Sequence, residues 1–373
     1  MVLLSPLRGF EPTVDPRQPR PRGRGYILSP LRGWKAGENT PYRALLSSRL
    51  HRRAAPFASS GCRNDISPRT EMPTYKLTIE YEGTRYSGWQ EQGNTARTIQ
   101  GNLLRAAAQV FGMDADIGGA GRTDAGVHAA GQVAHLRCAK VIPAELVSRK
   151  INDLLPHDIH ILSAEQAANG FHARHDALTR VYLYQISTRR SAFAKPFIWW
   201  IKDRLDVVRM SEAAAAIAGR HDFTAFSDKR MKADDSRIVV VERIEVALVD
   251  DLILIRIAAS HYVWKMVRKI VAALVEVGRG NWSSADFAAR LEPGAPNSEL
   301  TAPPSGLFLE AITYPGELFD RPLQALVPVV TPRLTRSSVD TLATKAPRDQ
   351  RRSRSKAKPP TRPGHGGGER RRG

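Results

Sequence analysis

The order of strand-like and helix-like segments between residues 75 and 162 constrains the fold more than any other feature of the chain. Residues 75–81 alternate between apolar and polar side chains, which is typical of a half-buried strand. A helix with apolar residues at helical spacing follows from Thr98, and a second helix begins at Pro143. Two strands lie between these helices and one follows them, so the order is β-α-β-β-α-β, which predicts a ferredoxin-like half. On its apolar side, the second helix is expected to carry Leu146, Ile151, Leu154 and Leu155.

The same order recurs in the second part of the chain. The expected elements are a strand at 180–186, an alanine-rich helix around 213–218, strands near 239–241 and 253–257, a helix from Met266 to Gly278 and a strand at 307–312. Two such halves, which we place at residues 72–168 and 169–327, predict a fold of the α/β (α+β) class. In it the halves form one mixed, mostly antiparallel sheet with a central cleft.

The two ends of the chain have compositions that cannot bury a core. Residues 1–71 hold 13 Lys+Arg against 5 Asp+Glu, and residues 331–373 hold 13 against 3. The intervening residues hold 30 against 29, so nearly all of the net charge of +19 on the 373-residue chain lies in the ends. A basic excess suggests a nucleic-acid partner. The nearly neutral middle, however, would have to bind RNA through a local basic cleft.

Three interpretations stay open for residues 1–71. Their Pro, Arg, Gly and Ser content fits a disordered arm, upstream sequence included by a misplaced start, or an Arg-rich, acid-poor transit peptide. Met72 reads as a natural start, because it stands directly before the first expected strand. From residue 328 onward we expect a disordered basic tail that holds RNA non-specifically.

The cysteine content and the hydropathy bound the cellular context. The two cysteines, Cys62 and Cys138, provide neither a zinc-ligand spacing nor a disulfide framework, which fits a reducing, cytoplasmic compartment. No run of about eighteen apolar residues exists that would span a membrane. The N-terminus also lacks the apolar core of a secretory signal.

The loop at residues 118–130, Gly-Gly-Ala-Gly-Arg-Thr-Asp-Ala-Gly-Val-His-Ala-Ala, combines backbone freedom with charge. Glycine lets a backbone come close to a ligand, while Asp124 supplies a carboxylate. Arg122 would either keep that carboxylate ionised or bind a phosphate. A phosphate-cradling GxxxxGK[ST] loop and a GxGxxG fingerprint are both excluded, because residues that they require are missing. An Asp that caps the amides of a turn is the ordinary alternative.

Within this loop, the string GAGRTDAGVHA resembles the signature of the tRNA pseudouridine synthase A family. The resemblance implies the pseudouridine synthase fold and places the essential aspartate of the family at Asp124. It also makes Arg122 and His128, in the same string, expected substrate contacts. Further family blocks match at Phe171-His172-Ala173-Arg174 and at Thr179-Arg180-Val181-Tyr182-Leu183-Tyr184. In the second block, Tyr182 falls on the active-site tyrosine that stacks on the target base, while Tyr184 on the same strand face is the expected core residue.

Arg268, in Met266-Val267-Arg268, falls on the active-site arginine of the family. A cation at the start of a helix is not stabilised by the helix dipole. A role outside the helix, in pairing with Asp124 or with a phosphate, therefore explains Arg268 better. Lys265 and Lys269 are expected to add charge for the RNA backbone. The preceding segment, His261-Tyr262-Val263-Trp264, departs from the commoner Phe-containing form, and the resemblance as a whole covers about residues 75–315.

The resemblance implies an isomerase, an intramolecular transferase, that converts uridine to pseudouridine at positions 38, 39 and 40 in the anticodon arm of tRNA. The target base must leave its stack to be reached. The reaction is redox-neutral, so no metal, nucleotide or other cofactor is expected, and the pairs His172/His175 and His157/His160 lack a third metal ligand. Asp124 would attack either C1′ or the pyrimidine ring, or else stabilise and deprotonate. A homodimer is expected, as in the family.

Three other interpretations stay open. A catalytically idle RNA-binding module could use the same fold, although the intact Arg-Thr-Asp core argues against it. A glycoside hydrolase normally needs a second carboxylate, and Asp222 is the one other acid in a matched block. The third is a pseudouridine synthase for another RNA site, because the motif does not distinguish well between enzymes with different target sites.

Overall fold

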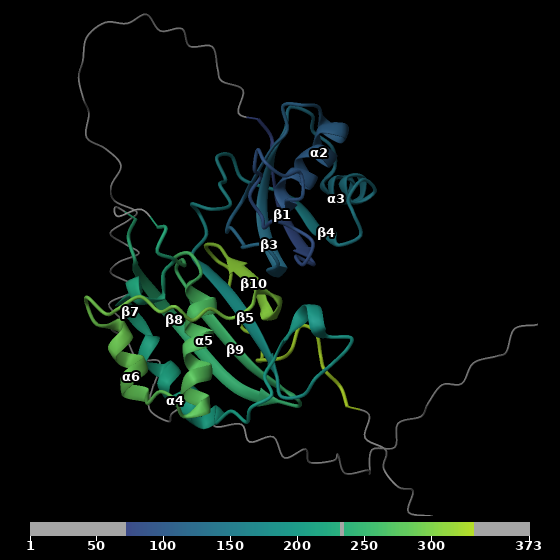
Figure 1. Cartoon of the computed structure of the whole chain (residues 1–373). Helices are drawn as coiled ribbons and strands as arrows, with labels where there is room; N and C mark the ends of the chain where they lie inside the picture. Colours follow the sequence, from purple (N-terminus) through teal and green to yellow (C-terminus); the bar gives the residue numbers. More distant parts are fainter. Residues whose placement is uncertain (1–71, 232–234, 332–373) are drawn as a thin grey trace, which may run out of the picture. The chain divides into compact units, whose positions relative to one another are not determined.

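The computed structural model describes residues 72–231 and 235–331 (Figure 1). The expectations for residues 1–71 and for the tail from residue 332 onward lie outside the described residues. The second half continues past the expected limit at residue 327, because Val329 is buried in a small apolar cluster with Leu183 and Leu254.

The described residues form ten strands. These are β1 (Thr74–Tyr81), β2 (Asp116–Gly119), β3 (His128–Arg137), β4 (Ile159–Gln166), β5 (Thr179–Ser187), β6 (Trp199–Trp200), β7 (Gly219–Asp222), β8 (Ile238–Val249), β9 (Leu252–Ala259) and β10 (Leu307–Thr313). All ten belong to one sheet in the order β4-β1-β3-β10-β5-β9-β8-β7, with β2 beside β3 and β6 beside β5. Among these pairs, β3–β10 and β5–β6 are parallel and the others are antiparallel.

Both halves have the predicted strand order. In the first half the order is β4-β1-β3-β2, and in the second half it is β10-β5-β9-β8. This is the same arrangement twice, which confirms two ferredoxin-like halves in one mixed, mostly antiparallel sheet. The halves join where β3 pairs with β10, at His128 with Phe308 and at Ala129 with Leu309. The two short strands β6 and β7 were not predicted from the sequence.

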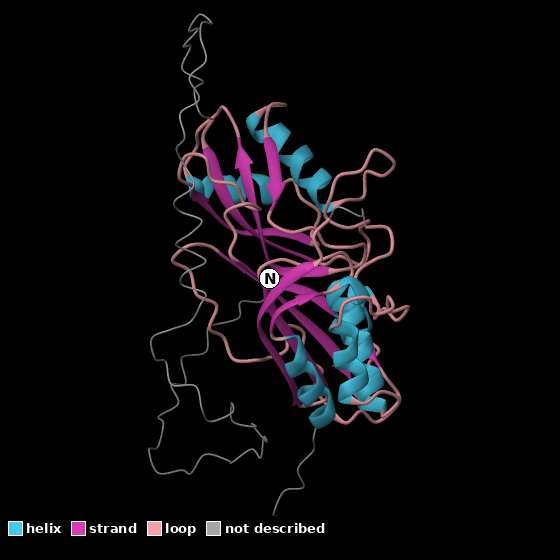
Figure 2. Cartoon of the chain, turned by 90° about the vertical axis from the view of Figure 1, so that its left-hand side faces the viewer, coloured by secondary structure: helices cyan, strands magenta, loops and turns pink. Residues whose placement is uncertain are grey.

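The helices in the described residues are α2 (Ile99–Phe111), α3 (Ala144–Asn152), α4 (Val207–Ala214), α5 (Met266–Arg279) and α6 (Ser284–Ala288). They lie beside both halves of the sheet (Figure 2). The Thr98 side chain accepts a hydrogen bond from the Gly101 amide and so caps α2, as its position predicts. In the second half, α4, α5 and α6 contact one another beside the strands (Figure 1).

The apolar face predicted for α3 was partly wrong. Val147 and Ile151 are its buried residues, whereas Leu146 and Leu154 are exposed. The helix ends at Asn152, so Leu154 and Leu155 lie beyond it, although Leu155 packs against the core as expected. Val147 and Ile151 are four residues apart, which is the spacing of side chains on one face of a helix.

The strand β9 is buried along its whole length, because both of its faces are covered. Ile255 and Ile257 belong to the main core together with residues of α5. The other face lies under a segment that we call the C-terminal strap, residues 319–330. Buried Arg256 donates to both carboxylate oxygens of Glu310, at 2.8 and 2.7 Å, and to two carbonyls of the strap at 2.9 and 3.1 Å. Arg256, which is paired with Glu310 of β10, therefore fixes the strap on the sheet through its two carbonyls.

Candidate active site

A cavity of about 870 Å³ has walls from both halves. The first half contributes residues 120–125 of the glycine-rich loop, and the second half contributes β5 and the segment that leads into α5. Among the described residues, the basic side chains that line it are Arg122, Arg174, Arg180, Arg230, Lys265 and Arg268, and the acidic ones are Asp124 and Asp235. The nearly neutral middle of the chain therefore contains a local basic cavity, as RNA binding would require.

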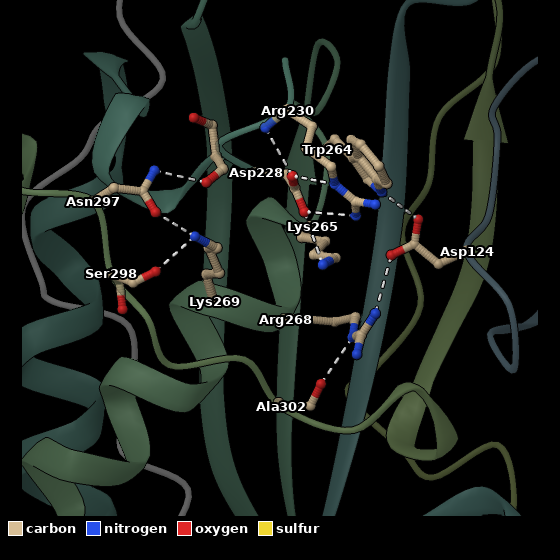
Figure 3. Close-up of polar contacts among 11 residues, drawn as sticks. Asp124, Asp228, Arg230, Trp264, Lys265, Arg268, Lys269, Asn297, Ser298 and Ala302 are labelled. Atoms are coloured by element: carbon tan, nitrogen blue, oxygen red, sulfur yellow. Dashed lines mark hydrogen bonds and ion pairs between the residues drawn. The ribbon is translucent and has the colours of Figure 1, made fainter.

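Both oxygens of the Asp124 carboxylate accept hydrogen bonds from the second half (Figure 3). Arg268 Nη1 lies 3.1 Å from Oδ2, and the indole Nε1 of Trp264 lies 2.9 Å from Oδ1. The Asp124 side chain is 27% exposed, so it still faces the cavity. The expected pairing of Arg268 with Asp124 is present. Charge-assisted hydrogen bonds of this kind are about twice as strong as neutral ones.

The start of α5 positions Arg268. Its Nε donates to the carbonyl of Ala302 at 2.8 Å, which fixes the guanidinium from the side away from Asp124. Lys265, the residue before the helix, has a φ of 65°. A left-handed conformation at a residue other than glycine costs roughly 1–2 kcal/mol and persists only where the surroundings hold it. An ion pair of 2.8 Å between Lys265 Nζ and Asp228 supplies that restraint.

Asp228 holds a second cation as well. Arg230 donates to its two carboxylate oxygens from Nε at 3.0 Å and from Nη2 at 3.2 Å. The hydrogen bond from Arg230, and then that from Lys265, holds the pKa of Asp228 well below its usual range. The guanidinium of Arg230 lies 4.1 Å from the centre of the Trp264 ring, a cation–π contact. Arg230 is thus fixed between a carboxylate and an indole.

The loop at residues 118–130 is shaped by close backbone contacts. Gly88 has a φ of 96°, and a Cβ there would lie 2.6 Å from the carbonyl of Thr123, so only glycine fits. The next residue donates its amide to the same carbonyl at 3.0 Å. The side chain of Gln132 accepts from the amide of Gly121 at 3.3 Å and donates to its carbonyl at 2.7 Å. Gly88, Trp89 and Gln132 therefore support the acid-bearing loop.

Tyr182 lies on β5 in the cavity wall and contacts Tyr262 edge-on, with ring centres 4.9 Å apart. Its hydroxyl makes no hydrogen bond to any residue that the structure describes. Burial, and then the neighbouring Tyr81 and Asp124, raises the pKa of Tyr182 well above its ordinary value, so the phenol stays neutral. Two positions along the strand, Tyr184 is buried and donates to a backbone carbonyl at 2.8 Å, as expected of a core residue.

Arg122 is exposed on the cavity wall. It forms no hydrogen bond or ion pair with the described part of the chain. The suggestion that Arg122 holds Asp124 ionised was therefore wrong, because Arg268 occupies that position. Its other suggested role, in binding a phosphate, stays a prediction.

His128 does not line the cavity around Asp124, in contrast to our expectation of a substrate contact there. It is buried, and its ring stacks on Phe308 with centres 4.8 Å apart. Nδ1 accepts from the Gly83 amide at 3.0 Å, so Nε2 carries the proton that is donated to the Pro196 carbonyl at 2.9 Å. Burial lowers the pKa of His128, which keeps the ring neutral. These contacts give His128 a packing role.

The expectation that Lys269 contacts the RNA backbone was also wrong. Its side chain is buried, and Nζ donates to Asn297 Oδ1 at 2.5 Å and to the Ser298 carbonyl at 2.6 Å (Figure 3). Burial lowers the pKa of Lys269. Lys269 therefore ties α5 to the segment that precedes β10, whereas Lys265 does line the cavity.

Three residues of the site were not predicted from the sequence: Asp228, Arg230 and Trp264. The one signal was that the segment ending at Trp264 departs from the commoner family form. Nothing local in the sequence pairs that segment with residues 228–230, because the contact depends on the fold. A further cavity residue, Arg180, donates to the carbonyls of Arg174 and Ser260, both at 2.7 Å, and so joins the cavity walls.

Within residues 72–231 and 235–331, no three side chains of His, Cys, Asp or Glu are grouped so as to hold a metal ion. The rings of His172 and His175 lie 4.2 Å apart. Of the helices in the same ranges, none combines the length and the apolar character that crossing a membrane needs.

Comparisons with known proteins agree with this geometry. The sequence model of the family described as tRNA pseudouridine synthase matches residues 77–176 and 213–315, and its gap includes β5 with Tyr182. The tRNA pseudouridine synthase A of Maricaulis maris is 40% identical over 250 residues, which cover 66% of this chain and 99% of that protein. The enzyme of the same name from Xanthobacter autotrophicus is 40% identical over 247 residues, 65% of this chain and 100% of that protein.

Among solved structures, a Cbf5–Nop10–Gar1 complex aligns over 56% of this chain and 46% of that chain, with 14% identity and a TM-score of 0.26, too low to inform the fold. The sequence comparisons are far stronger. The family model matches more than half of the chain, and the bacterial relatives align over nearly their whole length. The chain belongs to the tRNA pseudouridine synthase family.

Proposed function

We propose that this protein isomerises uridine to pseudouridine at positions 38, 39 and 40 in the anticodon arm of tRNA, with Asp124 as the catalytic carboxylate. One observation carries the proposal. Asp124 lies in a basic cavity with walls from both halves, and each of its oxygens accepts a hydrogen bond from an N–H donor, at 3.1 Å from Arg268 and 2.9 Å from Trp264. The site is thus built to present an oriented, ionised carboxylate to an anionic polymer.

The chemistry balances without any further reactant. The C1′–N1 bond of uridine breaks and the uracil turns, after which a C1′–C5 bond forms. C5 loses its proton, and N1 gains one. The ionised Asp124 attacks either C1′ or the pyrimidine ring, or else stabilises the charge that develops.

The base contact is assigned to Tyr182. A flipped base needs a flat surface to replace its lost stacking partners, and the ring of Tyr182 lies in the cavity wall. Burial raises the pKa of Tyr182, so the phenol is protonated in the unliganded protein. We therefore assign Tyr182 to stacking on the base.

Phosphate binding is assigned to the exposed cations of the cavity. Arg122 has no partner among the described residues, so its five donors are available to a phosphate. Arg174 is likewise an exposed cation of the cavity wall. From the family we further propose a cytoplasmic homodimer in which one tRNA crosses both subunits. The buried free thiol of Cys138 is compatible with a reducing compartment.

Tritium release tests the proposal. The full-length protein is incubated with tRNA whose uridines at positions 38, 39 and 40 carry tritium at C5, one labelled position at a time. We expect release from the unmodified protein and none from Asp124→Asn. The matched control is Asp222→Asn, which changes the same charge outside the cavity, where Asp222 accepts from Thr224 at 2.8 and 2.6 Å. This control is expected to keep its activity.

Each result has a distinct meaning. Release by Asp124→Asn would remove the catalytic role of that residue. No release by the unmodified protein, with the tRNA still bound, would indicate another target uridine or an idle binding module. Loss of activity in Asp222→Asn but not in Asp124→Asn would show that Asp222, and not Asp124, is the catalytic acid.

A further inference from the structure

The indole of Trp264 is placed unusually for so large an apolar side chain. The residue is 39% exposed on the cavity wall, although burying its large apolar area would stabilise the fold more. The indole nitrogen is a donor only, and it points at Oδ1 of Asp124 from 2.9 Å. Core packing does not explain this exposure, whereas a contact with the carboxylate does.

Two cations hold the indole in this position. Arg230 lies 4.1 Å and Lys265 Nζ lies 5.6 Å from the centre of the ring. Both cations are bound by the carboxylate of Asp228, at 3.0 and 2.8 Å. The amide of Asp228 also donates to the carbonyl of Trp264 at 3.0 Å. A single buried acid therefore fixes the backbone and the ring contacts of the tryptophan.

A carboxylate needs two contacts to have a fixed plane. The terminal torsion of an aspartate side chain is broad and roughly two-fold, so one bonded oxygen leaves the group free to rotate. Arg268 binds Oδ2 of Asp124 only, and Trp264 binds Oδ1. The two donors lie on either side of the first residue of α5, Met266. Together they define the plane of the Asp124 carboxylate.

From this arrangement we infer that Trp264 is a positioning residue, which holds the Asp124 carboxylate at the attack geometry through its indole N–H. The inference rests on the proposed function, because it concerns the same acid. Small errors in the placement of a reacting group are costly to rate. The loss of the N–H is therefore expected to slow turnover, while the remaining ring and its cations leave RNA binding intact.

The sharpest test replaces Trp264 by 3-benzothienylalanine, which keeps the shape of the indole and substitutes sulfur for the N–H. Trp264→Phe is a second variant, which keeps an aromatic ring for Arg230. The matched control is Trp282→Phe, because Trp282 also has an arginine over its ring, Arg290 at 4.8 Å, but does not line the cavity. Steady-state tritium release from the anticodon-arm tRNA gives kcat and KM for each protein.

Both replacements of Trp264 are expected to lower kcat by about ten- to a hundredfold, the effect of losing a hydrogen bond to a charged group. KM is expected to stay within about threefold of the unmodified value, since a loss in kcat alone marks an interaction used in the transition state. Trp282→Phe is expected to match the unmodified protein in both constants. A packing defect would not separate kcat from KM in this way.

Two results would overturn the inference and leave the proposed function standing. One is an unchanged kcat with 3-benzothienylalanine at position 264. The other is a loss that appears in KM alone, which would make Trp264 an RNA contact. If the unmodified protein releases no tritium from any labelled position, the proposed function fails and the inference falls with it.

Discussion

The two halves of the sheet share one strand order but differ in the connections that carry the site residues. In the first half, the connection between β2 and β3 is a long loop that carries Asp124. In the second half, the equivalent connection between β8 and β9 is the tight turn Asp250-Asp251. The second half instead carries its site residues on the segment between β9 and α5, which includes Trp264 and leads to Arg268. This segment is six residues long, as is the equivalent segment between β3 and α3.

As a result, the Asp124 carboxylate and the side chains that donate hydrogen bonds to it come from different halves. The first half supplies the carboxylate, and the second half supplies both donors to its oxygens. Neither half alone holds an oriented, ionised acid. A repeated framework therefore gives one site rather than two, because each half carries its site residues on a different connection.

The largest effect is expected when Asp124, on the connection between β2 and β3, is compared with Asp250, on the equivalent connection between β8 and β9. Asp124→Asn should lower tritium release by at least about a thousandfold, because the group that forms or stabilises the intermediate is lost. Asp250→Asn makes the same change at the equivalent turn of the second half. Asp250 has a φ of 53°, a conformation that asparagine tolerates, so this variant should fold and keep its activity. Equal losses in the two variants would contradict the division between the halves.

The second prediction separates a structural arginine from a functional one. Arg256→Met should lower the free energy of unfolding by about 3 kcal/mol, because it leaves the buried carboxylate of Glu310 without its partner. Urea denaturation measures this change. The double variant Arg256→Met/Glu310→Met removes both charges and should recover part of the loss. A single variant as stable as the unmodified protein would show that the ion pair does not anchor the C-terminal strap.

Arg268→Gln should act on turnover rather than on stability. The variant keeps hydrogen-bonding capacity but removes the charge that faces Asp124, so kcat should fall by about a hundredfold. The free energy of unfolding should change by less than about 1 kcal/mol, since a pair that is open to the cavity contributes little. If stability falls as much as in Arg256→Met, then Arg268 is a structural residue, and the contrast between the two arginines is lost.

The smallest effect concerns the acid that organises the second-half cations. The folded-state pKa of Asp228 is depressed by Arg230 and Lys265, so its contribution to stability is fully present above its unfolded pKa of about 4. That contribution is lost as the pH falls through the depressed value. The stability gap between the unmodified protein and Asp228→Asn should therefore be widest near neutral pH and narrow below about pH 4. Urea midpoints at several pH values test this, and a constant gap would refute it.

The regular elements could be predicted from the sequence because their signals are local. The helix after Thr98 and the alternation of β1 depend on neighbours within a few residues. On α3, by contrast, an error of one residue exchanged Leu146 for Val147 as the buried residue. A short helix with apolar residues on several sides does not specify its face by periodicity alone.

Asp124 and Arg268 were predicted as site residues by family resemblance, and the structure brings them together. The contacts of Lys269 and of Trp264 could not be predicted in this way. Lys269 finds its partners 28 and 29 residues later in the chain, and Trp264 reaches back 140 residues to Asp124. Such partners are set by how the two halves meet, and no short motif contains that information.

The position of β10 has a consequence for synthesis on the ribosome. This strand lies between β3 and β5 in the sheet, yet it is the last strand in the chain. The first half can pair its own strands once β4 has emerged, about 140 residues before β10 does. Until then, β5 and the part of β3 at His128 and Ala129 present an unpaired edge, the kind of edge that invites aggregation. A nascent chain of this protein should therefore depend on chaperones late in translation, when the two halves exist but the strand that joins them does not.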